Sequence, residues 1–442
     1  MAQINLENIL SLIERFSSAG RTGSGGVRRL GLTTEEFDAQ KILIDEIRQM
    51  GIEIGCDQFA NIIATIPGKT PEAAGIAIIC HLDTVVDGGH YDGALSAAAG
   101  LEILRIFLQD KLPLERNLHL VCFACGHSVR FGSGALGSRL WRGHIGDQEL
   151  NRLHDAFGIS AADALNEHRE RLLAYGLKPI NKKPQFTHVL EVHPEQGTTL
   201  ESLDSPAGIV AQVAGVIRHK LTIHGHALHA GTTPMLFRHD ALVGAAEIII
   251  AVEQEVKSCS SAGWPVATVG RIHNFPNATN VISDRTELYL DIRDFVEGRR
   301  DMASERILSR CREIAGQRAL PLDIELVALG QPVVCTENIA NKMQEMALAR
   351  GWDAPSLVSG AWHDSVVFAG WSKKAIIYIR TPGGEGLSIK EFCPPEDIEK
   401  GCQLLLDATE MLCGEILSGE ISNKETSCPE SSSGESSSGE AG

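Results

Sequence analysis

The sequence predicts an α/β protein in which a mixed, mostly parallel sheet domain is interrupted by a smaller ferredoxin-like α+β unit. Two patterns support this fold class. In the first half of the chain, short apolar runs typical of buried strands alternate with segments whose apolar residues recur at helical spacing. In the middle of the chain, strands of alternating polarity and two helices follow in a β-α-β-β-α order, which is typical of a ferredoxin-like unit.

The first part of the chain alternates helices and strands. Helices are expected at 5–16, 35–50 and 93–110, and strands at 52–66, 75–80, 118–124 and 187–192. A charged segment with helical periodicity, 145–184, precedes the last of these strands. In the inserted unit, strands are expected at 220–224, 265–273 and 286–293, and helices at 240–257 and 299–317.

Length and composition narrow the class of protein. At 442 residues the chain exceeds one ordinary core, and its formal net charge of −17 argues against nucleic acid or an anionic membrane as a partner. The eleven cysteines are scattered and follow no apolar signal segment, so we expect a reduced, cytoplasmic protein. Residues 416–442 are rich in Ser, Gly and Glu, and we expect this tail to be disordered.

Metal-binding residue types converge directly after the strand expected at 75–80. His81 and Asp83 leave the end of this strand on the same face, and Asp92 returns from a Gly-rich turn. Together with His193, they offer imidazole and carboxylate groups, which suit several divalent transition metals.

Several motifs in this order resemble the M20 family of metal-dependent amidohydrolases and peptidases. The motifs are HLDTVVDGGHYDGA, RFGSGALGSR, HPEQG, HAGTTPM, NVISD, DIRD and SGAWHDS. The branch that the chain resembles most is that of the N-carbamoyl-L-amino-acid hydrolases and allantoate amidohydrolases. The resemblance implies a discontinuous catalytic domain, residues 1–213 and 328–415, and a lid and dimerisation domain, residues 214–327. It also implies a homodimer.

The resemblance implies two ion positions, of which the first has all its ligands and the second is altered. The first of the family's two ions would be bound by His81, Asp92 and His193, with the Asp92 carboxylate shared by both ions. The second ion would have His127 where the family has a carboxylate and Leu387 where the family has a histidine. Since leucine cannot bind a metal and catalytic zinc sites usually have three protein ligands, we expect one divalent ion, zinc or manganese, rather than two.

The family's general base is also altered. Two adjacent glutamates precede a Gly-x-Arg-Phe segment in that branch, and here Gly126 stands at the position of the base. His127 is the candidate to transfer protons in its place, because imidazole titrates near neutral pH. Asp83 would orient His81. Cys125 would face the same way as His127 if the strand continued. The two would then be a nucleophile and its base, or thiolate and imidazole ligands to a softer metal; the alternative is an inert buried thiol.

The residues that hold substrate in the family are largely present. The resemblance implies that His229, Asn280 and Arg293 grip the carboxylate and carbonyl of a substrate, often across a dimer interface. Gln196 would contact a carbamoyl group, and His363 would line the site. An arginine fork suits a carboxylate because two parallel N–H bonds fix its plane. For Arg293 the alternative is a structural ion pair.

These observations leave three hypotheses for function. The first is a metal-dependent hydrolase that cleaves a linear amide, carbamoyl or ureido C–N bond of a small carboxylate substrate at a rebuilt metal centre. The second is a non-hydrolytic relative that binds a carboxylate ligand or acts as a structural or regulatory dimer. The third is an acyl or amidino transferase that uses Cys125 and His127.

Overall fold

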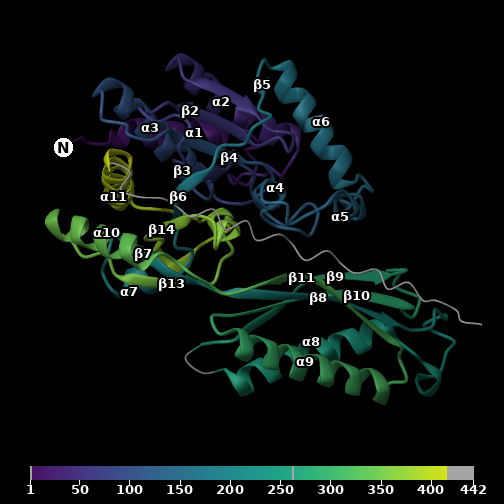
Figure 1. Ribbon diagram of the computed structural model, residues 1–442. Coiled ribbons are helices and arrows are strands. Elements are labelled where there is room, and N and C mark those ends of the chain that lie inside the picture. The colour runs from purple at the N-terminus through teal and green to yellow at the C-terminus, as the bar shows by residue number, and fades with distance from the viewer. Residues whose placement is uncertain (1, 261–262, 416–442) are drawn as a thin grey trace, which may run out of the picture.

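The computed structural model describes residues 2–260 and 263–415, and the predicted disordered tail at 416–442 lies outside these residues. A larger α/β domain lies above a smaller sheet-and-helix domain, and the chain crosses between them before β8 and after β11 (Figure 1). The predicted fold class is confirmed. No helix within the described ranges has the length and apolar content needed to cross a membrane.

The larger domain is built on a mixed sheet in the order β12-β7-β14-β6-β3-β4-β2-β1-β5, with β13 paired to β7. Its centre is parallel, because β3 pairs in parallel with β4 and β6, and β6 with β14. The strands are β1 (Glu53–Cys56), β2 (Ile62–Ile66), β3 (Gly75–His81), β4 (Leu118–Phe123), β5 (Lys178–Pro179), β6 (Phe186–Pro194), β7 (Ala207–Val213), β12 (Val333–Val334), β13 (Ser356–Ser359) and β14 (Lys373–Ile379).

Helices cover this sheet, as expected for parallel strands that are buried on both faces. They are α1 (Leu6–Ser18), α2 (Thr34–Gln49), α3 (Ala94–Gln109), α4 (Leu136–Trp141), α5 (Asp147–Arg152), α6 (Ala161–Ala174), α7 (Thr199–Ser202), α10 (Glu337–Ala349) and α11 (Pro395–Gly414). All residues of β3 and β4 are buried, and small side chains let α3 lie against them. The main core therefore forms around the strands that end at the predicted metal site.

The smaller domain has the topology of a ferredoxin-like unit. Its strands are antiparallel in the order β11-β8-β10-β9, and they are β8 (Gly215–His224), β9 (Val266–Phe275), β10 (Arg285–Asp294) and β11 (Leu322–Gly330). Helices α8 (Ala241–Cys259) and α9 (Glu297–Gln317) pack on the face turned away from the larger domain (Figure 1). Leu221, Ile223 and Leu288 belong to the core between helices and sheet. Since β11 continues to Gly330, this sheet extends three residues past the predicted boundary at 327.

The prediction of a single strand at 52–66 is wrong. Two antiparallel strands, β1 and β2, occupy this range and are joined by a tight turn. The Asp57 carboxylate accepts N–H bonds from Phe59 and Asn61, and Ala60 has a left-handed backbone with φ of 60°. An Asp that bonds the backbone two residues onward is a common turn former, and here it reverses the chain.

Candidate metal centre and binding cleft

The predicted metal ligands line a cleft of about 410 Å³ between the two domains. Within the described ranges, the larger domain contributes groups from strand ends, loops and the short helices α4 and α5, and the smaller domain contributes residues of β8, β10 and β11. Residues of this lining that bear on function are His81, Asp92, Gly126, His127, Arg139, Glu149, His193, Gln196, Arg218, Arg293, Trp362, His363, Tyr378 and Leu387.

The carboxyl ends of neighbouring parallel strands bring the ligands together. His81 is the last residue of β3, and His193 lies near the end of β6, which pairs with β3. Asp92 stands two residues before α3. The intervening Gly93 has φ of 69°, and a Cβ there would lie 2.5 Å from the carbonyl oxygen of His81. Glycine at this position therefore lets Asp92 approach His81, at the edge where α/β sheets usually bind ligands.

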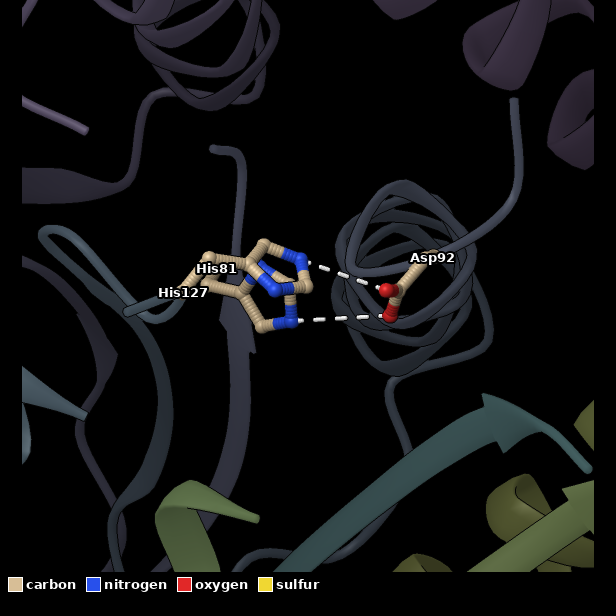
Figure 2. A group of neighbouring side chains, drawn as sticks. All are labelled: His81, Asp92 and His127. Atoms are coloured by element: carbon tan, nitrogen blue, oxygen red, sulfur yellow. Dashed lines mark ion pairs between the residues drawn. The ribbon is translucent and has the colours of Figure 1, made fainter. Parts of the chain in front are cut away.

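Asp92 lies at the centre of three imidazole rings. Its Oδ1 is 3.7 Å from Nε2 of His81 and 3.3 Å from Nδ1 of His193, and its Oδ2 is 3.2 Å from Nε2 of His127. Figure 2 shows His81 and His127 on the same side of this carboxylate, each facing one of its oxygens. The carboxylate thus has two imidazoles on one oxygen and one on the other.

Two of these imidazoles have a second carboxylate behind them. Nδ1 of His81 lies 3.4 Å from Oδ1 of Asp83, and Nε2 of His193 lies 3.7 Å from Oε2 of Glu191. Burial alone would lower the pKa of His193, but the contacts with Asp92 and Glu191 outweigh it and raise that pKa to about 9. Such carboxylate–histidine pairs fix the orientation of a metal-binding imidazole.

Asp83 is held from several directions. Its side chain is fully buried, and its two oxygens accept N–H bonds of 2.7 Å from the backbones of Gly126 and His127. Burial would raise the pKa of this carboxyl, but His81 and His127 lower it below its ordinary value. This geometry suits a residue that positions His81 and the 126–127 backbone.

The loop that carries His127 lies tightly against His81. A Cβ added to Gly126 would be 2.8 Å from Cγ of His81, closer than non-bonded carbon atoms approach, and 3.2 Å from Oδ1 of Asp83, which is a tight contact. The loop therefore occupies the space in which a larger residue 126 would begin.

The strand does not continue to Cys125 and His127, so the expectation that they face the same way is wrong. Strand β4 ends at Phe123, and Cys125 has φ of 56°. Its thiol is buried against Gly31 and lies 3.8 Å from the backbone oxygen of His127. Burial raises the pKa of this thiol well above its ordinary value. A Cys–His nucleophile pair is not formed, and the inert buried thiol is the interpretation that fits.

The donor groups fit a divalent metal ion. His81, Asp92 and His127 each offer a ligand atom within 4.8 Å of the others, and Glu191, His193 and His363 form a second group of this kind. Nε2 of His127 is buried and has no hydrogen-bond partner among the described residues. Imidazole and carboxylate together suit zinc or manganese. Leu387 lines the same cleft with a side chain that cannot bind a metal.

The predicted substrate-binding residues divide into two groups. Gln196, Arg293 and His363 line the cleft, whereas His229 and Asn280 are exposed and do not line it. His229 and Asn280 lie beside each other, because the N–H of Ala230 donates to the carbonyl of Asn280 at 2.9 Å. Within one chain, these two residues are therefore not part of the site.

The residues that do line the cleft are already hydrogen bonded within the protein. Arg293 donates to both oxygens of Asp291 and to the carbonyl of Gly360, so its predicted alternative, a structural ion pair, is formed with Asp291. Nε2 of Gln196 donates to Oε1 of Glu391 at 3.3 Å.

His363 is held at both of its ring nitrogens. Nδ1 lies 3.6 Å from Glu191, and Nε2 lies 2.8 Å from the hydroxyl of Tyr378 and 2.9 Å from that of Ser359. Sequence analysis missed Glu191 and Tyr378. The signal for Glu191 is its spacing, because residues two apart on a strand face the same side and it stands two before His193.

Comparison with known proteins establishes the family. A model of the peptidase family M20/M25/M40 matches residues 77–411. The chain is 33% identical over 411 residues to an N-carbamoyl-L-amino-acid amidohydrolase of Pseudomonas sp. (strain NS671), covering 92% of this chain and 98% of that protein. It is 28% identical over 400 residues to an allantoate amidohydrolase of Bacillus subtilis (strain 168), covering 90% and 96%.

Solved structures show the same fold. The structure of AtUAH in complex with glyoxylate matches with a TM-score of 0.86 and 26% identity, covering 93% of this chain and 98% of that chain. An amidase of the hydantoinase/carbamoylase family from Burkholderia vietnamiensis matches with a TM-score of 0.88 at 24% identity, which supports the fold alone, with the same coverage. The chain belongs to the M20 family. The predicted family and branch are confirmed, and so, at the level of the family, is the expected amidohydrolase class.

Proposed function

We propose that this protein is a metal-dependent hydrolase that cleaves a linear amide, carbamoyl or ureido C–N bond of a small carboxylate substrate, with one tightly bound ion. The observation that supports this most is the arrangement around Asp92, where His81 and His193 share one oxygen and each has a carboxylate behind it. The amidohydrolase relatives act on N-carbamoyl-L-amino acids and on allantoate, as their names state.

In this proposal, His81, Asp92 and His193 hold the ion, which would polarise the scissile carbonyl and a water molecule. His127 takes the place of the family base. Its Nε2 lies in the cleft, 3.2 Å from Oδ2 of Asp92, which places this nitrogen beside the carboxylate that would hold the ion. A positioned general base is worth about 10²–10⁴-fold in rate.

The test combines metal content with turnover. Protein purified without added metal is analysed for bound zinc and manganese, and ammonia release is measured with N-carbamoyl amino acids and allantoate. About one ion per chain with turnover is the expected result. No bound ion and no turnover would favour the second hypothesis, a non-hydrolytic relative that binds a carboxylate ligand. That alternative is supported by Leu387 and by the crowding at Gly126, which together remove a family ligand and the room for its base.

A reconstructed site separates the two hypotheses further. The double variant H127E/L387H supplies the two family ligands and leaves Gly126 unchanged, because a side chain there would press on His81. We expect it to bind about two ions per chain. The single variant L387H, which adds one ligand only, is its control. A double variant that holds no additional ion would contradict the assignment of His127 and Leu387 to a second ion position.

We further propose that residues 214–327 act as a lid and dimerisation domain, as the resemblance implies, and that the protein is a cytoplasmic homodimer. Exposed apolar side chains gather in and beside α8, namely Met235, Leu236, Phe237, Leu242, Val243 and Ile250. A dimer interface would bury such a patch. In light scattering, I250E should shift the protein toward monomer, whereas V334E, at an exposed valine of the larger domain, should not.

A further inference from the structure

Three arginines reach the cleft, and they differ in how much of each guanidinium is used by the protein. Arg293 makes three hydrogen bonds, two to Asp291 and one to the carbonyl of Gly360. Arg139 donates to Ser133 at 2.7 Å and lies 3.5 Å from Glu149. Arg218 makes one hydrogen bond among the described residues, from Nε to Oδ2 of Asp291 at 2.6 Å. Its two Nη groups are therefore available in the cleft.

The sheet of the smaller domain fixes the position of Arg218. Arg218 on β8 is directly opposite Asp291 on β10, and Arg293 follows Asp291 by two residues on the same face. Because α8 and α9 cover the opposite face, this face is turned toward the larger domain (Figure 1). Asp291 anchors both arginines from behind the cleft, and the planar Nη1–Nη2 edge of Arg218 remains open. An edge of this kind binds a carboxylate through two parallel N–H bonds.

The charges around Arg218 favour an anion. In their ion pairs the three guanidinium groups have two carboxylates, those of Asp291 and Glu149, so Arg218 shares the charge of Asp291 with Arg293. The pKa of Arg139 is lowered, chiefly by burial and in smaller part by the like charge of Arg218, whereas Glu149 opposes the shift. A carboxylate between Arg139 and Arg218 would relieve this repulsion.

We propose that Arg218 is the residue that binds the carboxylate of the substrate, with Arg139 of the larger domain facing it, while Arg293 mainly holds Asp291 and the Gly360 carbonyl. This inference rests on the proposed function for the presence of a carboxylate substrate. Arg218 lies on β8 of the smaller domain and Arg139 on α4 of the larger domain. The carboxylate of the substrate would therefore contact both domains. This role also explains why the fork of Arg218 is left open next to an arginine whose three nitrogens each donate within the protein.

The test uses two ligands that differ only in this group, N-carbamoylglycine and N-carbamoylglycinamide. Release of glycine or glycinamide gives kcat/KM, and calorimetry gives Kd, so that binding is measured even without turnover. The wild type should prefer the carboxylate. R218Q should lose about 10- to 100-fold of that preference, because hydrogen bonds to a charged group are lost, and R218K should recover only part of it.

The matched control is K220Q. Lys220 lies two residues away on the same face of β8, pairs with Glu287 at 3.1 Å, and does not line the cleft. This variant should retain the carboxylate preference and the metal content of the wild type. A preference that survives in R218Q and disappears in R293Q would overturn the proposal, and so would equal losses for both ligands in R218Q.

The same measurements distinguish a failure of the proposed hydrolase function from a failure of the role of Arg218. A wild type that binds N-carbamoylglycine through Arg218 without releasing glycine would leave this inference standing and contradict the hydrolase. Turnover of both ligands at equal rates, with R218Q unaffected, would support the hydrolase and contradict the role of Arg218. A wild type that binds neither ligand would overturn both.

Discussion

The two oxygens of Asp92 face surroundings that differ in how they are supported. On the Oδ1 side, His81 and His193 come from neighbouring buried strands, and each has a carboxylate at its far nitrogen. On the Oδ2 side, His127 comes from a loop beyond β4 and has no carboxylate behind its ring among the described residues. Strands hold side chains more firmly than loops do, so we infer that the first side retains an ion and the second retains a single movable imidazole.

The largest effect is expected from removing the group that the two sides share. D92N leaves both sides without a charged oxygen, and we expect bound metal to fall from about one ion per chain to background, with loss of any turnover. The control is D87N, at an exposed aspartate of the same turn whose φ of 51° asparagine also tolerates. Elemental analysis of both variants makes the comparison. Full metal content in D92N would show that the ion does not lie at Asp92.

The next largest effect is expected from changing Glu191, the carboxylate behind His193 on the Oδ1 side. E191Q should weaken metal binding about 10- to 100-fold, because an amide orients the imidazole of His193 less strongly than a carboxylate does. S365A removes the other hydrogen bond of Glu191, 2.6 Å to its Oε1, and keeps the carboxylate, so it should have a smaller effect. Titration against a competing chelator gives both affinities. Equal affinities in E191Q and the wild type would remove the distinction between the two sides.

The pH dependence follows from the raised pKa of His193, about 9 in the presence of Asp92 and Glu191 and without an ion. A histidine whose folded pKa is above its ordinary value of 6.5 stabilises the metal-free protein below pH 6.5, and this contribution is lost as pH rises through 9. Metal binding requires neutral imidazoles, and although burial would lower the pKa of His81, Asp83 and Asp92 raise it well above its ordinary value, so affinity should rise about tenfold or more per pH unit between 6.5 and 9. Calorimetry in two buffers of different ionisation enthalpy should detect the released proton. In E191Q the pH range should move downward, and an unchanged range would contradict this origin.

The smallest effect is expected at Gly126, where the loop that carries His127 lies against His81. G126A places a Cβ 2.8 Å from Cγ of His81, and we expect a loss of about 1–3 kcal/mol in the free energy of unfolding of the metal-free protein. In G134A the new Cβ would be no closer than 3.4 Å to its neighbours, and stability should change by less than about 0.5 kcal/mol. Urea unfolding in the presence of a chelator measures both. Equal stabilities would indicate that the loop does not press on His81.

Much of this could be predicted from the sequence. The apolar runs at 75–80 and 118–124 indicate buried strands of a parallel sheet, and His81 follows the first run at the strand end where such sheets usually bind ligands. The motif HLDTVVDGGHYDGA indicates the family without any coordinates, and the residues Gly126, His127 and Leu387 lead to the hypothesis of an altered metal site. The order of strands and helices after residue 214 is sufficient for the ferredoxin-like unit.

Other features depend on contacts between residues far apart in the sequence, and only the tertiary structure decides these. The end of β4 at Phe123 buries Cys125, although the local pattern permits a longer strand. Glu191 lies behind His193 because β6 is buried next to the loop that carries His363. The pairing of β8 with β10 lets Asp291 hold both Arg218 and Arg293 while leaving one fork open. Sequence spacing specifies which residues share a strand face, whereas the partners that fill their hydrogen bonds are set by packing across strands and domains.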